Sequence, residues 1–174
     1  RATRTGGYRD VEIVFDGKML TVNNKDGKDY AQIEAAGTAE ELIDVLRDKH
    51  GVVAPGADLL LTNVFNVMMA DVVEAAVIGK GVIDGVECDH VALRLRQGID
   101  VQLWIRTGAV ALPERIVINY ATADGRPQFR ANLTEWDLSP RVPDRSFRSD
   151  PPKGAKSVPF VAPRRNAAVQ EEER

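Results

Sequence analysis

Four Asp-Gly pairs divide much of this 174-residue chain into short segments rich in β-branched and aromatic residues. The pairs are Asp16-Gly17, Asp26-Gly27, Asp84-Gly85 and Asp124-Gly125. Asp-Gly favours a tight β-hairpin, because the preferred two-residue turn needs positive φ at both central residues, which glycine adopts freely and aspartate tolerates. The pairs therefore predict a chain built mainly from antiparallel hairpins.

Eight segments have the alternation or the β-branched content expected of strands. They span residues 11–15, 18–24, 28–34, 72–83, 86–96, 100–106, 114–123 and 128–138. The alternation is clearest in the sixth segment, where Val101, Leu103 and Ile105 share one face. Two helices are expected between the third and fourth strands.

The first helix is predicted from Thr38 to His50. Thr38 and Glu41 form a capping-box pattern, in which the threonine hydroxyl and the glutamate carboxylate each accept a hydrogen bond from a backbone amide of the first turn. Gly51 is suited to end the helix, because it adopts a left-handed conformation easily.

The second helix is predicted from Asp58 to Asp71 and is apolar nearly all round. A helix of this kind needs burial on more than one side. It is either a core helix or a movable plug over an apolar cavity, and its methionines suit a deformable surface. The plug side chains would be Leu60, Leu61, Val64, Phe65 and Met68.

The C-terminal region has a different composition, with six of the nine prolines between Pro140 and Pro163. Helices are disfavoured there, although extended segments around Phe147 and Phe160 can add edge strands. Basic side chains in this region form either a solvated face or a surface attracted to anionic lipids. The length predicts one domain over residues 1–163, followed by a disordered tail over residues 164–174.

The bulk composition excludes several classes of function. A net charge of −3 and a pI near 5.5 argue against a nucleic-acid partner. No segment approaches the roughly 20 apolar residues that span a bilayer, so the chain is not expected to cross a membrane.

No motif indicates catalysis or a cofactor, and the chain is expected not to be an enzyme. Cys88 and His90 share a face of one predicted strand and suit either packing, a thiol nucleophile or two ligands of a zinc site that needs about four. Packing is favoured, since His50 would have to come from a helix end and no third soft ligand lies near in sequence. Trp104 lies on the face opposite Leu103, where it covers a second surface or contacts a partner.

Several motifs carry a family resemblance across residues 9–160. They are Phe15-Asp16-Gly17-Lys18-Met19-Leu20-Thr21-Val22, Tyr30-Ala31-Gln32, Asp84-Gly85-Val86-Glu87-Cys88-Asp89-His90-Val91-Ala92, Asp100-Val101-Gln102-Leu103-Trp104-Ile105, Leu112-Pro113, Ile116-Val117-Ile118-Asn119-Tyr120, Pro127-Gln128-Phe129-Arg130-Ala131, Trp136, Pro143-Asp144 and Phe147. Together they resemble a bacterial family of uncharacterised predicted periplasmic proteins. That family is similar to the lipoprotein-carrier superfamily.

The resemblance implies a mainly β, LolA-like fold with a helical insertion: an antiparallel, unclosed β half-barrel plugged by two helices. It also implies a periplasmic location. Proteins of this superfamily usually carry an N-terminal helix and further strands before the position of Arg1, so the chain is expected to be either truncated or a shortened copy. The expected function is binding or carrying an apolar ligand, such as a lipid or a lipoprotein acyl chain, with an envelope sensor or protein-interaction module as the alternative. The sheet face beneath the plug is expected to be formed by Leu103, Ile105, Ile116, Ile118, Phe129 and Leu133.

Overall fold

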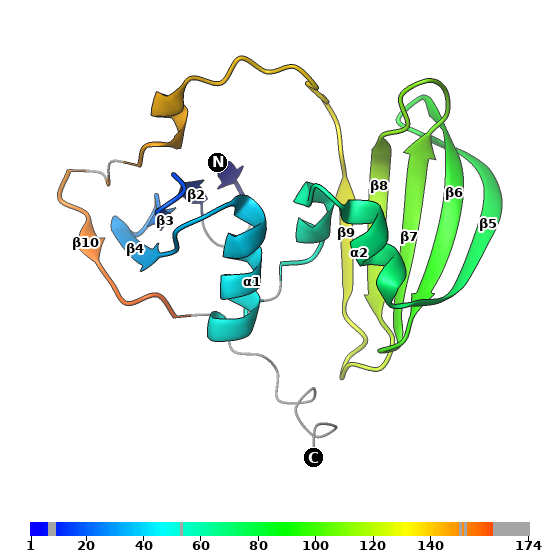
Figure 1. Cartoon of the computed structure of the whole chain (residues 1–174), viewed down its shortest axis with the longest axis horizontal. Coiled ribbons are helices and arrows are strands. Elements are labelled where there is room, and N and C mark those ends of the chain that lie inside the picture. The colour runs from blue at the N-terminus through cyan, green and yellow to red at the C-terminus, as the bar shows by residue number, and fades with distance from the viewer. Residues whose placement is uncertain (7–9, 53, 150, 152, 162–174) are drawn as a thin grey trace. The chain divides into compact units, whose positions relative to one another are not determined.

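A computed structural model describes residues 1–6, 10–52, 54–149, 151 and 153–161. These residues form two compact units (Figure 1). The first unit contains the described residues up to 52 and those from 139 onward, and the second contains residues 54–138. The second unit is therefore an insertion within the first. The expectation of one half-barrel domain stays a prediction, and the expected tail, residues 164–174, lies outside the described residues.

The first unit is built on a five-stranded sheet with the order β1-β2-β3-β4-β10. Its strands are β1 (Ala2–Arg4), β2 (Val11–Phe15), β3 (Met19–Asn24), β4 (Asp29–Glu34) and β10 (Lys156–Ser157). The first four strands pair antiparallel, whereas β10 runs parallel to β4. Strands β2, β3 and β4 were expected from the sequence, and β1 adds a short edge strand.

Helix α1 (Ala39–His50) confirms the first predicted helix. The Thr38 hydroxyl accepts from the Glu41 amide at 3.2 Å, and the Glu41 carboxylate accepts from the Thr38 amide at 2.7 Å. Gly51 ends the helix with a φ of 63°, and its amide donates to the Arg47 carbonyl. Leu42 packs with Leu20 of β3 in the buried core of this unit.

The C-terminal segment covers one face and one edge of the first sheet. The Asn23 side-chain amide donates to the Ser149 hydroxyl at 2.9 Å, and the Val158 amide donates to the Tyr30 carbonyl at 2.9 Å. A short 3₁₀ helix, η2 (Asp144–Phe147), replaces the extended segment expected around Phe147. The prolines of this segment are compatible with its pairing to the sheet, because β10 joins at an edge, where proline is tolerated.

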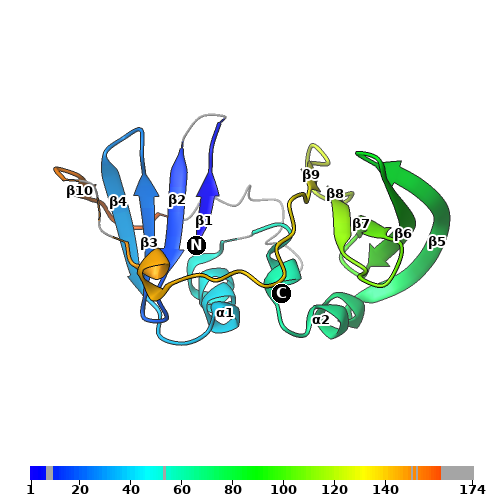
Figure 2. The same ribbon diagram turned by 90° about the horizontal axis from the view of Figure 1, so that it is seen from above.

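The second unit is a five-stranded antiparallel sheet in which the strands follow their order along the chain (Figure 2). Its strands are β5 (Val72–Ile83), β6 (Val86–Leu95), β7 (Ile99–Arg106), β8 (Pro113–Tyr120) and β9 (Gln128–Asn132). All five were expected, although β8 and β9 end earlier than predicted. The described structure is thus mainly β, and neither sheet closes on itself within the described residues.

Each Asp-Gly pair joins two antiparallel strands, so the predicted hairpins are confirmed. The four turns do not share one backbone geometry. Only at Asp84 and Gly85 do both residues of the pair have positive φ, 48° and 88°. After Asp26-Gly27 and Asp124-Gly125, the turn continues into a left-handed Lys28 and a left-handed Arg126. The expectation of positive φ at both residues was therefore wrong for the other pairs, because longer loops shift the left-handed position along the chain.

The second predicted helix, from Asp58 to Asp71, was wrong as a continuous element. The structure has a 3₁₀ helix, η1 (Ala57–Leu60), and a short α-helix, α2 (Val64–Ala70). Asp58 lies within η1 rather than at a cap. Asn63 precedes α2, but its side chain accepts from the Asn66 side chain at 2.7 Å and makes no capping hydrogen bond to the backbone. Thr62 and Asn63 interrupt the helix because such side chains compete for hydrogen bonds in non-helical conformations.

Candidate functional site

The candidate binding face is the apolar face of the second sheet. Pairing places Val91, Leu103, Ile116 and Ala131 in one row across β6, β7, β8 and β9. Side chains at paired positions point to the same face, so each strand contributes to one continuous surface. The buried cluster on this face consists of Leu93, Val101, Leu103, Ile116 and Ile118.

All six sheet residues expected from the sequence meet on this face. Leu103, Ile116 and Ile118 are in the buried cluster, and Ile105, Phe129 and Leu133 pack against it. The period-2 alternation of β7, β8 and the segment that starts with β9 identifies this set, because residues two apart on a strand point the same way.

The expected plug residues are only partly brought to this face. Met68 of α2 packs against the cluster, as does Leu59 of η1. Leu60 and Phe65 are instead 74% and 70% exposed. Leu61 and Val64 are half-buried.

The helix interruption explains this distribution. In one continuous helix from Asp58, residues 60, 61, 64, 65 and 68 would lie on one stripe. The break before Val64 changes the direction of the chain, so Leu59 packs in place of Leu60. Sequence periodicity missed Leu59 because it assumed an unbroken helix.

Helix α2 is weakly held by the rest of its unit. It has seven residues, none of them buried, and neither end has a side-chain cap. Val67 and Met69 are exposed together with Phe65. By contrast, α1 has both a capping box and a left-handed glycine at its end.

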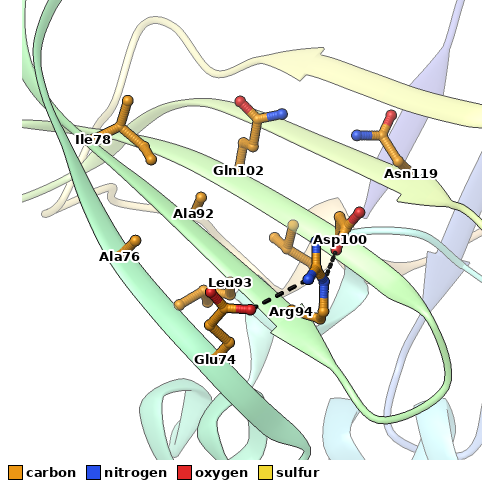
Figure 3. A pocket seen from close by; sticks show the side chains of 10 residues that line it. Glu74, Ala76, Ile78, Ala92, Leu93, Arg94, Asp100, Gln102 and Asn119 are labelled. Carbon is orange, nitrogen blue, oxygen red and sulfur yellow. Dashed lines mark hydrogen bonds and ion pairs between the residues drawn. The ribbon is translucent and has the colours of Figure 1, made fainter.

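The opposite face of the second sheet carries a pocket of about 300 Å³ (Figure 3). Ala76 and Ala92 lie at its middle, between larger side chains from four strands. At one end, Arg94 pairs with Glu74 at 3.2 Å and with Asp100 at 3.1 Å. The pocket is therefore polar at its rim, and its one guanidinium is already paired with two carboxylates.

Cys88 and His90 do share a strand face, but they interact with different groups. The His90 imidazole stacks on Trp104 with ring centroids 4.1 Å apart, and its Nε2 is 2.9 Å from the Gln102 side-chain oxygen. The buried Cys88 thiol donates to the Val86 carbonyl at 3.4 Å. Burial raises the pKa of the Cys88 thiol, and the negative charge of Glu114 raises it further. A higher pKa lowers the thiolate fraction and with it the nucleophilicity of the sulfur.

Other candidate chemistry on the described residues is sparse. No group of three or more His, Cys, Asp or Glu side chains is placed to hold a metal ion in the part of the chain that the structure describes. His50 lies in the first unit, where its ring meets Phe160 edge-on at 5.4 Å. Trp104, on the face opposite Leu103, lies beneath Arg115, whose guanidinium carbon is 5.7 Å from the ring centroid.

Comparison with protein families identifies a match over most of the chain. The family model for "Predicted periplasmic protein (DUF2092)" matches residues 1–161. The chain belongs to this family. A comparison with curated proteins finds no match to the chain.

Family membership supports the location expected from the sequence. As a member of a family of predicted periplasmic proteins, the protein is assigned to the periplasm. Among the described residues, no helix combines the length and the apolar character needed to cross a membrane.

Sequence reasoning missed one arrangement in this family member, the stacked pair of His90 and Trp104. The signal was available in principle, since both residues lie on the face opposite Leu103. What the sequence lacked was the register of β6 against β7, which places His90 directly opposite Trp104. Register depends on the turn and on the whole hydrophobic pattern, so it does not follow from two residues alone.

Proposed function

We propose that this protein binds an apolar ligand, the acyl chain of a lipid or lipoprotein, on the apolar face of the second sheet. Segment η1 and helix α2 act as the movable cover. The supporting observation is that α2 lies next to an apolar face with no buried residue of its own, while Phe65 points to solvent. The resemblance to the LolA-like half-barrel of lipoprotein carriers supports the same function.

The proposed mechanism is burial rather than specific polar recognition. Each methylene group removed from water contributes about 0.8 kcal/mol, so an acyl chain can be held without charged partners. The apolar face is occupied by Leu59 and Met68 in this structure. Loading therefore requires these two side chains to withdraw, which the weak attachment of α2 favours. Phe65 and Leu60 then turn from solvent onto the ligand.

The first test is native mass spectrometry of freshly purified protein, followed by solvent extraction. A bound lipid or fatty acid is the expected result, and its mass identifies the ligand class. A protein that is folded and carries nothing after purification from a lipid-rich envelope extract would contradict the proposal.

A substitution at Phe65 tests the cover directly. Phe65→Asp should weaken binding of a dansyl-labelled fatty acid by about tenfold or more, because a buried phenylalanine contributes roughly 1.5–3 kcal/mol. Its exposure means that the fold should tolerate the change. Val110→Asp, at an exposed apolar position between β7 and β8, is the matched control and should bind as the unmodified protein does. Equal affinity of the two variants would exclude Phe65 from the site.

A second candidate is an envelope sensor or interaction module with the same fold and no ligand. It is favoured by the occupied state of the apolar face, which Leu59 and Met68 already contact. This alternative predicts a protein without bound lipid, and it predicts that Phe65→Asp and Val110→Asp leave fatty-acid fluorescence equally low.

A further inference from the structure

The outer strands of the two sheets differ sharply in length and character. Strands β1 and β10 have three and two residues, and β9 has five. Three of the five residues of β9 are exposed polar side chains, namely Gln128, Arg130 and Asn132. Short or charged edges of this kind resist pairing with another chain. Strand β5 is the exception, with twelve residues.

The edge of β5 is apolar. Val73, Val77, Ile78 and Val82 are 58%, 76%, 57% and 68% exposed. No described residue pairs with the outer side of β5, and the strand contains no proline. A long apolar edge with unpaired backbone groups is a template for another strand.

Both charged side chains of β5 already have ion-pair partners within the sheet. Glu74 pairs with Arg94 at 3.2 Å, and Lys80 pairs with Asp89 at 2.7 Å. An incoming strand that brought unpaired charges would therefore find no free partner on β5, whereas one whose own charges are already paired would need none. The edge instead fits an extended, apolar and electrically neutral segment.

Strand β5 is itself such a segment, and its pattern is symmetric. The midpoint of Val72–Ile83 falls between Val77 and Ile78. When two copies of β5 are aligned antiparallel about this midpoint, Val77 of each copy lies opposite Ile78 of the other. The same alignment places Val73 opposite Val82. An interface between identical copies needs this self-complementary arrangement.

The charged residues fit the same alignment. Glu74 of one copy lies opposite Gly81 of the second, and Lys80 lies opposite Ala75. No like charges meet directly, which avoids the main electrostatic cost of pairing two strands of one sequence. Irregularities in the pairing with β6 also leave Val73 and Ile78 without a Cα partner on that strand.

We propose that the protein forms a twofold dimer in which β5 pairs antiparallel with β5 of a second copy. The pairing joins the two second-unit sheets edge to edge and buries the exposed valines and isoleucine of both strands. The proposal does not require a bound ligand, because the pairing uses the backbone edge of β5, although Val77 is paired with Val91 and so lies at the margin of the apolar face.

Light scattering during size-exclusion chromatography tests this proposal on the full chain. The unmodified protein should have the mass of a dimer. Val77→Lys should be a monomer, since it brings two ammonium groups together next to the twofold axis, and its exposed position preserves the fold. Val110→Lys is the matched control and should remain a dimer.

Cross-linking tests the alignment itself. Val77→Cys should form a disulfide-linked dimer on mild oxidation, whereas Val110→Cys should not. The natural Cys88 is buried and does not compete. A monomeric unmodified protein, a Val77→Lys variant that stays dimeric, or binding of unrelated extended peptides by a monomer would overturn the proposal. None of these results depends on whether lipid is bound.

Discussion

At the scale of single residues, the least obvious interactions lie on the face of the second sheet opposite the proposed binding face. Glu114 is buried, and its carboxylate accepts from the Arg106 Nε at 2.7 Å. Arg106 is itself more than a third exposed, so water partly screens the pair. The pair illustrates why an acidic residue inside a strand pattern is tolerated, since a buried carboxylate is acceptable when it is paired.

Removing one member of this pair should destabilise the protein more than removing both. Arg106→Leu leaves the buried Glu114 carboxylate without its partner and should lower the free energy of unfolding by about 1–3 kcal/mol. The double variant Arg106→Leu with Glu114→Leu should recover part of that loss. Urea unfolding measures both values. A double variant that is no more stable than Arg106→Leu would contradict this account.

The buried Cys88 thiol predicts a dependence of stability on alkaline pH. Its folded pKa lies above the ordinary value of 9.0, because burial disfavours the thiolate. The folded state therefore binds more protons than the unfolded state above that value, and stability falls as pH rises. In Cys88→Ala this part of the decline should disappear. Unfolding midpoints measured for both proteins on either side of pH 9 provide the test, and parallel curves would refute it.

At the scale of elements, local hydrogen-bond patterns were more reliable guides than hydrophobic patterns. The capping box and Gly51 predicted α1 almost to the residue, because cap chemistry is decided within a few positions of the chain. For α2 the hydrophobic pattern predicted a helix, but Thr62 and Asn63 broke it. Hydrophobic periodicity shows which residues are apolar. It does not show where polar side chains between them interrupt the helix.

The difference between the two helices can be measured through their caps. Thr38→Ala removes a capping hydrogen bond and should lower the free energy of unfolding by about 1 kcal/mol. Asn63→Ala removes no side-chain cap and should cost much less, since the Asn63 side chain accepts from the exposed Asn66 side chain and its backbone carbonyl still accepts from the Val67 amide after the change. Chemical denaturation of both variants is the measurement. Equal losses would mean that Asn63 stabilises α2 in another way.

The candidate binding face shows the same division between what the sequence reveals and what it conceals. Alternation in β7, β8 and the segment that starts with β9 located the sheet residues, because strand geometry forces residues two apart onto one face. The cover was harder to predict. Whether Leu59 or Leu60 packs against the sheet depends on the direction in which the short helix η1 runs. That direction is set by tertiary contacts rather than by local propensity.

At the scale of the whole molecule, the chain forms a discontinuous unit with a continuous unit inserted in it. All strand pairs of the second sheet lie within residues 72–132, whereas the first sheet needs β10 from the far end of the chain. Sequence analysis expected that a segment around Phe160 could add an edge strand, but it did not predict the pairing of β10 with β4 or the division into two units, because β10 has only two residues. Its pairing with β4 is a long-range contact that no local pattern announces.

The insertion also has a consequence for the order in which the molecule is completed. A chain that is made or exported from its N-terminus has all strands of its second sheet available before Lys156 appears. The first sheet then keeps an open β4 edge until the last segment arrives. A protease that removes the segment after Leu138 would leave the inserted sheet whole and reopen the edge of the first. The segment after Leu138 therefore completes a sheet whose other strands are made much earlier in the chain.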